Sequence, residues 1–436
     1  MVPHLTTALN GPLLDLEKRM LADMPKIEHW FRSQWLEYSS PFYASVDLRN
    51  AGFKLAPVDT NLFPGGFNNL NPEFLPLSIQ AAMVAIEKIC PDAHRLLIIP
   101  ENHTRNTYYL GNVVELANIM RQAGLEVRVG SISPEITVPT TLVTHDGQKL
   151  LLEPVVRKGN RLVIEHSAFQ HGLSNDFDSC AILLNNDLSG GIPEILQNLE
   201  QNLIPPLHAG WATRRKSQHF SAYNLVAKEF ANLLDIDPWL INPYFSTCGA
   251  IDFNAREGEE CLVLKIDELL MKIQAKYAEY GIKQDPFVIV KADAGTYGMG
   301  IMTVKSPDDV RNLNRKTRNK MSVIKEGLQV TEVIIQEGVY TFESINEAIA
   351  EPVVYMMDHF VVGGFYRVHT GRGIDENLNA PGMHFVPLAF DKPCTTPDCA
   401  GAPDATPNRF YAYGVVARLA LLAAAIELQE NDPNNP

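Results

Sequence analysis

The feature of this sequence that most limits its fold is a glycine-rich turn between two short apolar runs. Residues 287–290 are aromatic or β-branched, which predicts a buried strand, and this strand leads into Lys291. Residues 301–304 form the second apolar run, so the stretch predicts a β-hairpin whose tip can fold over a ligand. The tip contains Gly295, Gly298 and Gly300.

The composition of this turn suits an anionic ligand. Glycines allow backbone N–H groups to approach phosphate oxygens closely, and a lysine at the end of the strand adds a positive charge for the same anion. The stretch is not a Walker loop, because no Gly-Lys-Ser/Thr sequence opens a helix here. The alternative is a flexible hairpin with a solvated lysine, since glycine spacing alone is a weak signal.

The length and charge of the chain restrict its class. A chain of 436 residues is too long for a single hydrophobic core, which predicts two or three domains. The net charge of −14, without a long basic run, argues against nucleic acid as a partner. We expect no signal peptide, and residues 415–428 are too short to span a bilayer and contain Arg418, so they predict a buried helix. The expected location is therefore the cytoplasm.

The six cysteines are few for this length and scattered along the chain. Cys394 and Cys399 flank four residues, but no second pair or histidine cluster completes a zinc site. We therefore expect free thiols, as is usual in a reducing cytoplasm.

The first half of the chain alternates strand and helix patterns. Residues 95–100 predict a strand, 113–122 a helix and 125–130 a second strand, which favours a parallel, Rossmann-like sheet. Ligands of such sheets bind beyond the carboxyl ends of the strands. Polar residues follow the first strand at that edge, either to bind a ligand or to cap the helix. They include Glu101, Asn102, His103, Arg105 and Asn106.

Residues 49–74 predict a long loop that is rich in Pro, Gly and Asn. Long loops without secondary structure are often functional, and this one also carries charged side chains that turns do not require. The alternative is a series of tight turns in which Asn and Gly adopt positive φ angles. The polar residues of the loop include Arg49, Lys54, Asp59, Asn61 and Asn68.

Three groups of polar residues follow the glycine-rich hairpin. A strand runs into residues 336–339, where exposed backbone groups could bind an adenine edge. Asp358 lies on the turn between two apolar strands, and a carboxylate there could hold Mg²⁺. Arg367 is on the next strand, followed by a loop with several oxygen-bearing side chains. Those side chains are Asp375, Glu376, Asn377 and Asn379, and the alternative is a solvated acidic turn.

The order and spacing of these residues resemble those of the ATP-grasp ligases, and of glutathione synthetase in particular. From Asp358 to Arg367 there are 9 residues and from Arg367 to Asn377 there are 10, close to the metal Asp, strand Arg and metal Asn of that family. The closing Gly-Gly of the family is Pro381-Gly382 here. The resemblance implies a nucleotide site of Lys216, Lys291, Gly295, Gly298, Gly300, Gln336, Glu337 and Val339. It implies catalytic roles for Lys291 and Arg367, and Mg²⁺ on Asp358, Asn377 and either Glu376 or Asp375.

Across essentially all 436 residues, the chain is more specifically similar to a bacterial glutamate–cysteine ligase family of this ATP-grasp-like kind. The blocks around 46–70 and 98–112 carry this resemblance. It implies that ATP phosphorylates the γ-carboxyl of L-glutamate and that L-cysteine attacks the acyl phosphate, the first step of glutathione synthesis. The expected substrate-binding residues are Arg49, Lys54, Asp59, Asn61, Asn68, Glu101, Asn102 and Arg105.

The predicted fold is α/β with two domains. Residues 1–205 form a Rossmann-like, pre-ATP-grasp substrate domain, and residues 206–436 form an ATP-grasp domain whose two α+β lobes hold ATP and Mg²⁺ between them. Pro205-Pro206 is the predicted linker. The partners are small molecules, and the sequence leaves open whether the chain forms a homo-oligomer. Alternatives are glutathione synthetase or another amino-acid ligase, a small-molecule kinase of the same fold, and a nucleotide-binding regulator.

Overall fold

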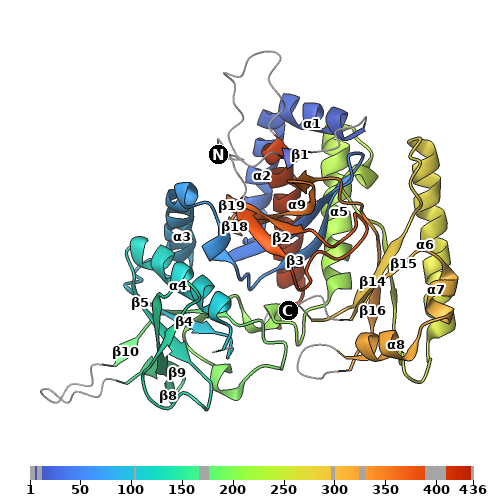
Figure 1. Cartoon of the computed structure of the whole chain (residues 1–436). Helices are drawn as coiled ribbons and strands as arrows, with labels where there is room; N and C mark the ends of the chain where they lie inside the picture. The colour runs from blue at the N-terminus through green and yellow to red at the C-terminus, as the bar shows by residue number, and fades with distance from the viewer. Residues whose placement is uncertain are drawn as a thin grey trace, which may run out of the picture.

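The computed structural model describes residues 5–6, 12–102, 105–165, 176–295, 300–323, 329–387 and 409–433. Within these residues the chain forms four β-sheets with helices packed around them. In the view of Figure 1, a parallel sheet lies at the lower left, an antiparallel sheet in the centre and a smaller antiparallel sheet on the right. Short 3₁₀ segments occupy Phe67–Asn69, Pro72–Phe74, Glu194–Leu196, Leu207–Ala209 and Pro238–Leu240.

The first large sheet has six strands and confirms the predicted parallel βαβ unit. Its order is β12 (Asn202–Ile204), β11 (Ala181–Asn185), β4 (Arg95–Pro100), β5 (Glu126–Ser131), β7 (Lys149–Pro154) and β6 (Thr140–Val143). The first five strands are parallel to their neighbours, and β6 is antiparallel to β7. Strands β4 and β11 read as continuous apolar runs because both of their faces are buried. The helices of this region are α3 (Leu75–Ile89) and α4 (Thr107–Gln122).

A small three-stranded antiparallel sheet adjoins this region, in the order β10 (Phe177–Asp178), β9 (Arg161–Ile164) and β8 (Val156–Lys158). In the same part of the chain, β6 and β7 form a further antiparallel pair.

The central sheet has seven strands, all antiparallel to their neighbours. The long hairpin of β18 (Ala348–Met357) and β19 (Phe360–His369) is its main element. The remaining strands are β1 (Leu5–Thr6), β17 (Ser344–Ile345), β20 (His384–Pro387), β2 (Tyr43–Asn50) and β3 (Leu55–Asn61). Strand β2 pairs with β18, and β3 pairs with β2.

The four-stranded sheet contains the glycine-rich hairpin. Its order is β13 (Phe245–Cys248), β16 (Val333–Glu337), β14 (Val288–Ala292) and β15 (Ile301–Val304). The β14–β15 pairing, with Lys291 opposite Ile301, confirms the predicted hairpin. Helix α6 (Glu259–Glu279) packs on this sheet, and α7 (Pro307–Arg311) and α8 (Arg315–Ser322) lie nearby (Figure 1).

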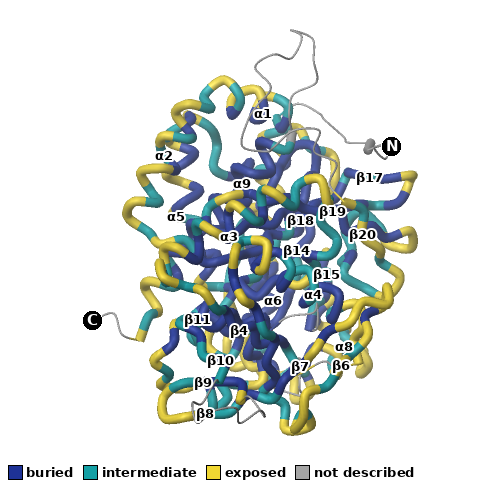
Figure 2. The backbone as a smooth tube through the Cα atoms, turned by 90° about the vertical axis from the view of Figure 1, so that its left-hand side faces the viewer, coloured by how far each residue is buried: buried dark blue, intermediate teal, exposed yellow. Residues whose placement is uncertain are grey.

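Four further helices form a group beside the central sheet: α1 (Pro12–Ala22), α2 (Met24–Glu37), α5 (Lys216–Leu234) and α9 (Arg409–Glu430). Helix α9 packs against α5, β2 and β3. It is long and apolar enough to cross a membrane by length and composition, but 89% of its apolar window is buried inside the protein. Figure 2 shows this burial around α9, which is apolar around its whole circumference as a core helix should be.

The predicted domain boundary does not separate the sheets of this fold. Strands β2 and β3 come from the first 205 residues, yet they belong to the same sheet as β18 and β19. The prediction of a loop over residues 49–74 is partly wrong, because Leu55–Asn61 forms an edge strand of this sheet. Pro57 and a register shift after Asp47 disguise that strand in the sequence, because proline is tolerated in a sheet only at edges or irregular positions.

The expectation of free thiols is also partly wrong. Cys90, which follows α3, forms a disulfide with Cys180, which precedes β11, and so links a helix to the parallel sheet. Cys248 and Cys261 are free thiols. Cys394 and Cys399 lie outside the described residues.

Candidate active site

A cavity of about 800 Å³, counted with its open mouth, lies between the central sheet and the four-stranded sheet. It receives side chains from β2, β3, β18 and β19 on one side, and from β14, β15, β16 and the start of α5 on the other. The described residues that line it are Asp47, Arg49, Val58, Asp59, Lys216, Ile289, Lys291, Ala292, Gly295, Ile301, Gln336, Glu337, Val339, Glu351, Arg367, Asn377 and Asn379.

One wall of the cavity carries two buried lysines beside one carboxylate. Lys216 Nζ forms an ion pair with Asp59 Oδ1 at 2.9 Å, and Lys291 Nζ donates to the Val58 carbonyl oxygen at 2.7 Å. Burial lowers the pKa of Lys291 to about 8. Burial alone would raise the pKa of Asp59, but Lys216 and Lys291 outweigh it and hold this pKa well below its usual range. The wall therefore presents excess positive charge, which suits a polyphosphate.

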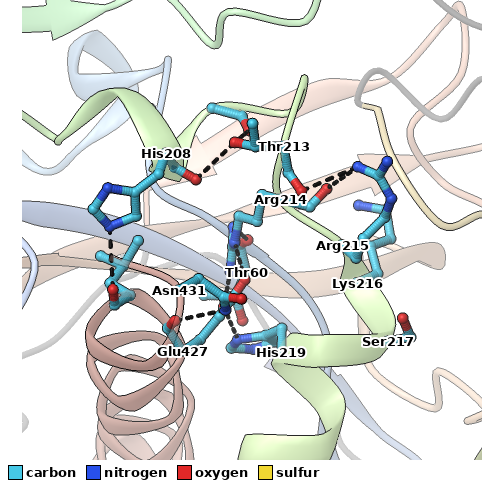
Figure 3. A network of polar contacts seen from close by, with 12 residues as sticks. Thr60, His208, Thr213, Arg214, Arg215, Lys216, Ser217, His219, Glu427 and Asn431 are labelled. Carbon is cyan, nitrogen blue, oxygen red and sulfur yellow. Dashed lines mark hydrogen bonds and ion pairs between the residues drawn. The ribbon is translucent and has the colours of Figure 1, made fainter. Parts of the chain in front are cut away.

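A buried network lies next to Lys216, and Figure 3 shows its part around Arg214 and Glu427. The neighbouring Arg214 donates to both carboxylate oxygens of Glu427 on α9, at 2.8 and 3.0 Å. Arg214 also donates to the Thr60 carbonyl oxygen at 2.7 Å, one residue from Asp59. Because Asp59 is the ion-pair partner of Lys216, the network links α9, β3 and the first residue of α5.

Lys216 has further contacts that fix its orientation. Its backbone N–H donates to the Asp293 carbonyl oxygen at 2.8 Å, directly after β14. Its ammonium lies over the Trp211 ring, 4.0 Å from the ring centroid. This cation–π contact and the ion pair keep the charge at the cavity although the residue itself is buried.

The adjoining wall carries two arginines and two carboxylates, and its Asp47 is the register partner of Asp59 in the β2–β3 pair. Arg367 Nη1 contacts Glu351 Oε1 at 2.5 Å, because Glu351 and Arg367 are register partners in the β18–β19 hairpin. The same Nη1 contacts Asp47 Oδ2 on β2 at 2.8 Å. Arg49 Nε contacts Glu351 Oε2 at 3.1 Å. Burial raises the pKa of the Asp47 carboxyl, and Glu351 adds to this, although Arg367 opposes both. Arg367 Nε has no partner among the described residues, so a donor is left for a ligand.

A mainly apolar wall with one unsatisfied amide completes the cavity. Ile289, Ala292 and Val339 supply apolar surface. Gln336 is 2% exposed, and its Nε2 has no hydrogen-bond partner among the described residues. A buried donor without a partner is costly, so a ligand that accepts this hydrogen bond would be favoured.

Ten of the predicted site residues come together in this cavity. They are Arg49, Asp59, Lys216, Lys291, Gly295, Gln336, Glu337, Val339, Arg367 and Asn377. Gly300 lies beside it, where its carbonyl oxygen accepts from the Ala292 N–H at 3.2 Å, whereas Gly298 is outside the described residues. The sequence prediction missed Asp47 and Glu351 and named Asn379 only as part of the polar loop, although all three line the cavity. Glu351 could have been found from the sequence, because it lies in a long apolar strand and a buried glutamate is rare unless it has a charged partner.

Two residues of the predicted substrate loop have structural partners instead. Lys54 is 1% exposed, and its Nζ pairs with Glu337 Oε2 at 2.8 Å. The same Glu337 carboxylate accepts from Trp239 Nε1 and from the Tyr244 N–H, so this cluster supports the strand behind the cavity. Asn61 closes a local turn by accepting from the Phe63 N–H.

The other predicted substrate residues lie away from the cavity lining described above. Asn68 is in a 3₁₀ segment, and its amide lies close to Gly111 of α4. Glu101, Asn102 and Arg105 follow β4 at the edge of the parallel sheet, as expected from the sequence, and Asn102 and Arg105 are exposed. The structure therefore does not bring this group together with Lys291 and Arg367.

The structure separates Asp358 from the other predicted metal ligands, so it does not support that assignment. Asp358 lies seven residues beyond Glu351 along the hairpin, a distance of about 23 Å at the usual strand rise. Its carboxylate contacts Lys88 and Ser40, and it is not among the described residues lining the cavity. Burial would raise its pKa, but His359, Lys88 and Ser40 outweigh this and lower it to about 2.

Glu376 and Asp375 are close to the cavity but have other partners. The Glu376 carboxylate accepts from the Gly373 N–H at 2.7 Å and from Arg372 Nη1 at 2.9 Å. Only its backbone oxygen faces Arg49, which donates to it at 2.6 Å. Asp375 forms an ion pair with Lys305 at 2.6 Å. Of the predicted metal ligands, Asn377 alone lines the cavity among the described residues.

No cluster of three or more His, Cys, Asp or Glu side chains forms a metal site within the described residues. Asp47, Glu351 and Asn377 nevertheless all line the cavity, and the Asn377 amide oxygen accepts from the Asn379 N–H at 2.9 Å. Mg²⁺ commonly uses one or two protein carboxylates and takes its remaining ligands from water and substrate phosphates. These residues therefore fit Mg²⁺ only in combination with a phosphate ligand.

Comparisons with known proteins agree with the resemblance seen in the sequence. The family model of glutamate-cysteine ligase (GshA) matches residues 17–428. A crystal structure from Methylobacillus flagellatus KT, described as a candidate gamma-glutamylcysteine synthetase, is 78% identical and has a TM-score of 0.90. The match covers 99% of this chain and 100% of that one. No curated protein matches the chain.

Two distant structures also match, at a level that supports no argument. D-alanyl-alanine synthetase A from Vibrio cholerae is 11% identical with a TM-score of 0.33, and the match covers 74% of this chain and 80% of that one. A glutathione synthetase-like effector from Globodera pallida is 10% identical with a TM-score of 0.36, over 82% of this chain and 79% of that one. The family model and the M. flagellatus structure are decisive: the chain belongs to the glutamate–cysteine ligase family.

Proposed function

We propose that this protein uses ATP to join the γ-carboxyl of L-glutamate to the amine of L-cysteine, which gives γ-glutamylcysteine. Family membership over residues 17–428 supports the ligase activity. The observation that carries the mechanism is one cavity in which a wall with two lysines adjoins a wall of arginines and carboxylates. A carboxylate is a poor electrophile, so its phosphorylation to an acyl phosphate would allow the amine to attack.

The lysine wall is the proposed phosphate site. Lys291 and Lys216 approach the same space from β14 and α5, and together they exceed the charge of Asp59. Phosphoryl transfer depends mainly on positioning and charge stabilisation, so two fixed ammonium groups are suitable catalysts. Gly295, at the end of the hairpin, leaves room for the backbone to approach the phosphates.

The apolar wall is the proposed adenine site. An adenine ring would pack between Ile289, Ala292 and Val339, and it would supply an acceptor for the Gln336 amide. The Lys54–Glu337 pair behind the wall would support this segment from inside the lobe. These contacts support the proposal that the cavity is a nucleotide site of the ATP-grasp kind.

The arginine wall is the proposed site of the γ-carboxyl and of the phosphoryl group that it receives. Arg367 has an unsatisfied Nε, and its Nη1 is held in place by Asp47 and Glu351. A guanidinium held by two carboxylates is preorganised, so it can bind an anion with little loss of side-chain entropy.

The same wall would hold Mg²⁺. Glu351, Asp47 and Asn377 are the candidate ligands, in place of the predicted Asp358 and Glu376. When bound, Mg²⁺ would neutralise negative charge on the phosphates of ATP. The role of Glu101, Asn102 and Arg105 in substrate binding stays a prediction, as does the location in the cytoplasm.

The test is phosphate release from ATP with amino acids supplied singly and in pairs. We expect slow release with L-glutamate alone, fast release when L-cysteine is added, and γ-glutamylcysteine as the product. Turnover with γ-glutamylcysteine plus glycine, and none with glutamate plus cysteine, would show a glutathione synthetase. Phosphorylation of one amino acid without ligation would show a kinase, and turnover independent of amino acids would rule out a ligase.

A further inference from the structure

Two free thiols contact each other in the four-stranded sheet region, away from the cavity. Cys248 is the last residue of β13, and Cys261 lies in the first turn of α6. Their sulfur atoms are 2.6 Å apart. A disulfide bond is about 2.05 Å long, so a shift of about half an ångström would bring the two sulfurs to bonding distance.

The two thiols differ in accessibility, which sets the order in which they could react. Cys261 is exposed, whereas Cys248 is 3% exposed. Burial raises the pKa of Cys248 to about 12, and the neighbouring Cys261 thiol adds to this effect. The thiolate is the reactive form in disulfide exchange. Cys261 is therefore the thiol that an external reagent can reach, and Cys248 is held where it can react only with Cys261.

We propose that Cys261 and Cys248 form a thiol–disulfide exchange site for small disulfides of the cystine class. Cys261 attacks one sulfur of the small disulfide, its S–S bond breaks, and one free thiol leaves with a proton. Cys248 then attacks the mixed disulfide at Cys261, and the second small thiol leaves with the second proton. The protein loses two electrons and gains the Cys248–Cys261 bond, while one small disulfide becomes two thiols.

The position of the pair supports fast closure of this bond. Because the two sulfurs already contact each other, the second step is intramolecular and has a high effective concentration. The loop to be closed is short, since only the segment between β13 and α6 separates the two cysteines. Helix α6 also packs against β13, so its first turn is held beside the strand. The chain already forms one disulfide between a helix end and a strand, at Cys90–Cys180.

This site is independent of the proposed ligase reaction. Cys248 pairs with Val333 at one end of the β13–β16 ladder, whereas Phe245 pairs with Gln336 of the cavity at the other end. Neither cysteine is among the described residues that line the cavity. The inference can therefore fail while the ligase assignment stands, and the reverse is also true.

The test is to treat the full-length protein, with Cys248 and Cys261 as thiols and the Cys90–Cys180 disulfide intact, with cystine and to map its thiols by mass spectrometry of peptides. For the wild type we expect a Cys248–Cys261 cross-link, with the loss of two hydrogens and the release of two cysteines for each cross-link. For Cys248→Ser we expect a stable cysteinyl group on Cys261 and the release of one cysteine. For Cys261→Ser we expect no modification of Cys248.

Cys248→Ala serves as a second variant in case a buried serine hydroxyl disturbs folding, and it should also keep the cysteinyl group on Cys261. The Cys90–Cys180 peptides provide an internal reference for disulfide detection. The proposal is overturned if wild-type protein retains the cysteinyl group without forming the cross-link. It is equally overturned if Cys261 does not react with cystine, or if Cys248 reacts in the Cys261→Ser variant.

Discussion

The two ends of the β18–β19 hairpin each hold a buried carboxylate between cationic partners, but they have different surroundings. At one end, Glu351 pairs with Arg49 and Arg367, and all three side chains line the cavity. At the other end, Asp358 pairs with Lys88, whose side chain is 54% exposed at the surface. A buried carboxylate with a cationic partner is therefore not enough to identify a metal site.

The difference lies in what remains available to a ligand. At the Glu351 end, Arg367 keeps an unsatisfied Nε among the described residues, and two lysines face the same space. At the Asp358 end, the carboxylate accepts from Ser40 and Lys88, and it contacts His359. The first arrangement is suited to binding a ligand, whereas the second ties the hairpin turn to the segment before β2 and to α3.

The Glu351→Gln variant tests most directly whether the Glu351 end of the hairpin is the active site. This change removes the negative charge between Arg49 and Arg367, so we expect kcat/KM to fall by about 10³-fold. The measurement is ATP-, glutamate- and cysteine-dependent phosphate release, with thermal unfolding to establish that the variant is folded. A folded Glu351→Gln protein with near wild-type activity would contradict the assignment of this end as the active site.

Lys291→Ala tests the lysine wall. Loss of a charge-assisted contact to the transferring phosphoryl group should reduce kcat/KM by about 10²-fold or more. The fold should persist, because no carboxylate is left without an ion pair: Asp59 keeps Lys216. Steady-state kinetics at varied ATP concentration measure the effect, and thermal unfolding of the variant shows how much a general packing defect contributes. Unchanged kinetics in folded Lys291→Ala would remove this lysine from the mechanism.

Arg214→Lys tests whether the buried network positions Lys216. Lysine cannot make the bidentate contact with Glu427 and also reach the Thr60 carbonyl, so Asp59 and Lys216 should shift. We expect KM for ATP to rise about tenfold with little change in kcat. Arg418→Lys is the matched control, since Arg418 on α9 makes a bidentate pair with Glu28 and does not line the cavity among the described residues. Equal changes in the KM for ATP in both variants would contradict a specific role of the Arg214 network in positioning Lys216.

The pH dependence of nucleotide affinity should reveal the lowered pKa of Lys291. Its ammonium is present below pH 8 and is lost as the pH rises through about 8, whereas an ordinary lysine keeps its charge to about 10.4. Affinity for ADP should therefore weaken above pH 8, by at most about tenfold for each pH unit. Calorimetric titrations between pH 7 and 9.5 measure it. Lys291→Arg should remove this dependence, and the account fails if the arginine variant retains it.

The smallest expected effect on activity is that of Asp358→Asn. Asparagine tolerates the positive φ of 48° at this turn, so the backbone should remain unchanged. The loss of charge opposite the half-exposed Lys88 should cost about 1 kcal/mol of stability. Activity and its dependence on Mg²⁺ concentration should match those of the wild type. A raised Mg²⁺ requirement in Asp358→Asn would restore this residue as a ligand.

Local patterns predicted the parts of the fold that depend on neighbouring residues. The β14–β15 hairpin with Lys291 and the βαβ unit around β4 were correctly predicted because their signals lie within a few residues. Lys216, Gln336 and Arg367 were placed through the resemblance to a family, and the structure brings them to one cavity. Their roles in binding and catalysis remain predictions.

The features that sequence reasoning missed depend on pairing between distant strands. Asp47 enters the cavity because β2 pairs with β18, about 300 residues later in the chain. Asp358 lies outside the cavity lining because the length of the hairpin separates it from Arg367 in space, which their proximity in the sequence does not reveal. The Cys90–Cys180 bond joins residues 90 positions apart, and nothing in the local sequence of either cysteine indicates it.

The most direct test of the central claim is a crystal structure with Mn²⁺ and a non-hydrolysable ATP analogue, in which anomalous scattering locates the metal. The account predicts Mn²⁺ about 2.1 Å from a carboxylate oxygen of Glu351 or Asp47. The phosphates should contact Lys291 and Lys216, with adenine beside Gln336. Mn²⁺ bound at Asp358, or a nucleotide outside the cavity between the two sheets, would contradict it.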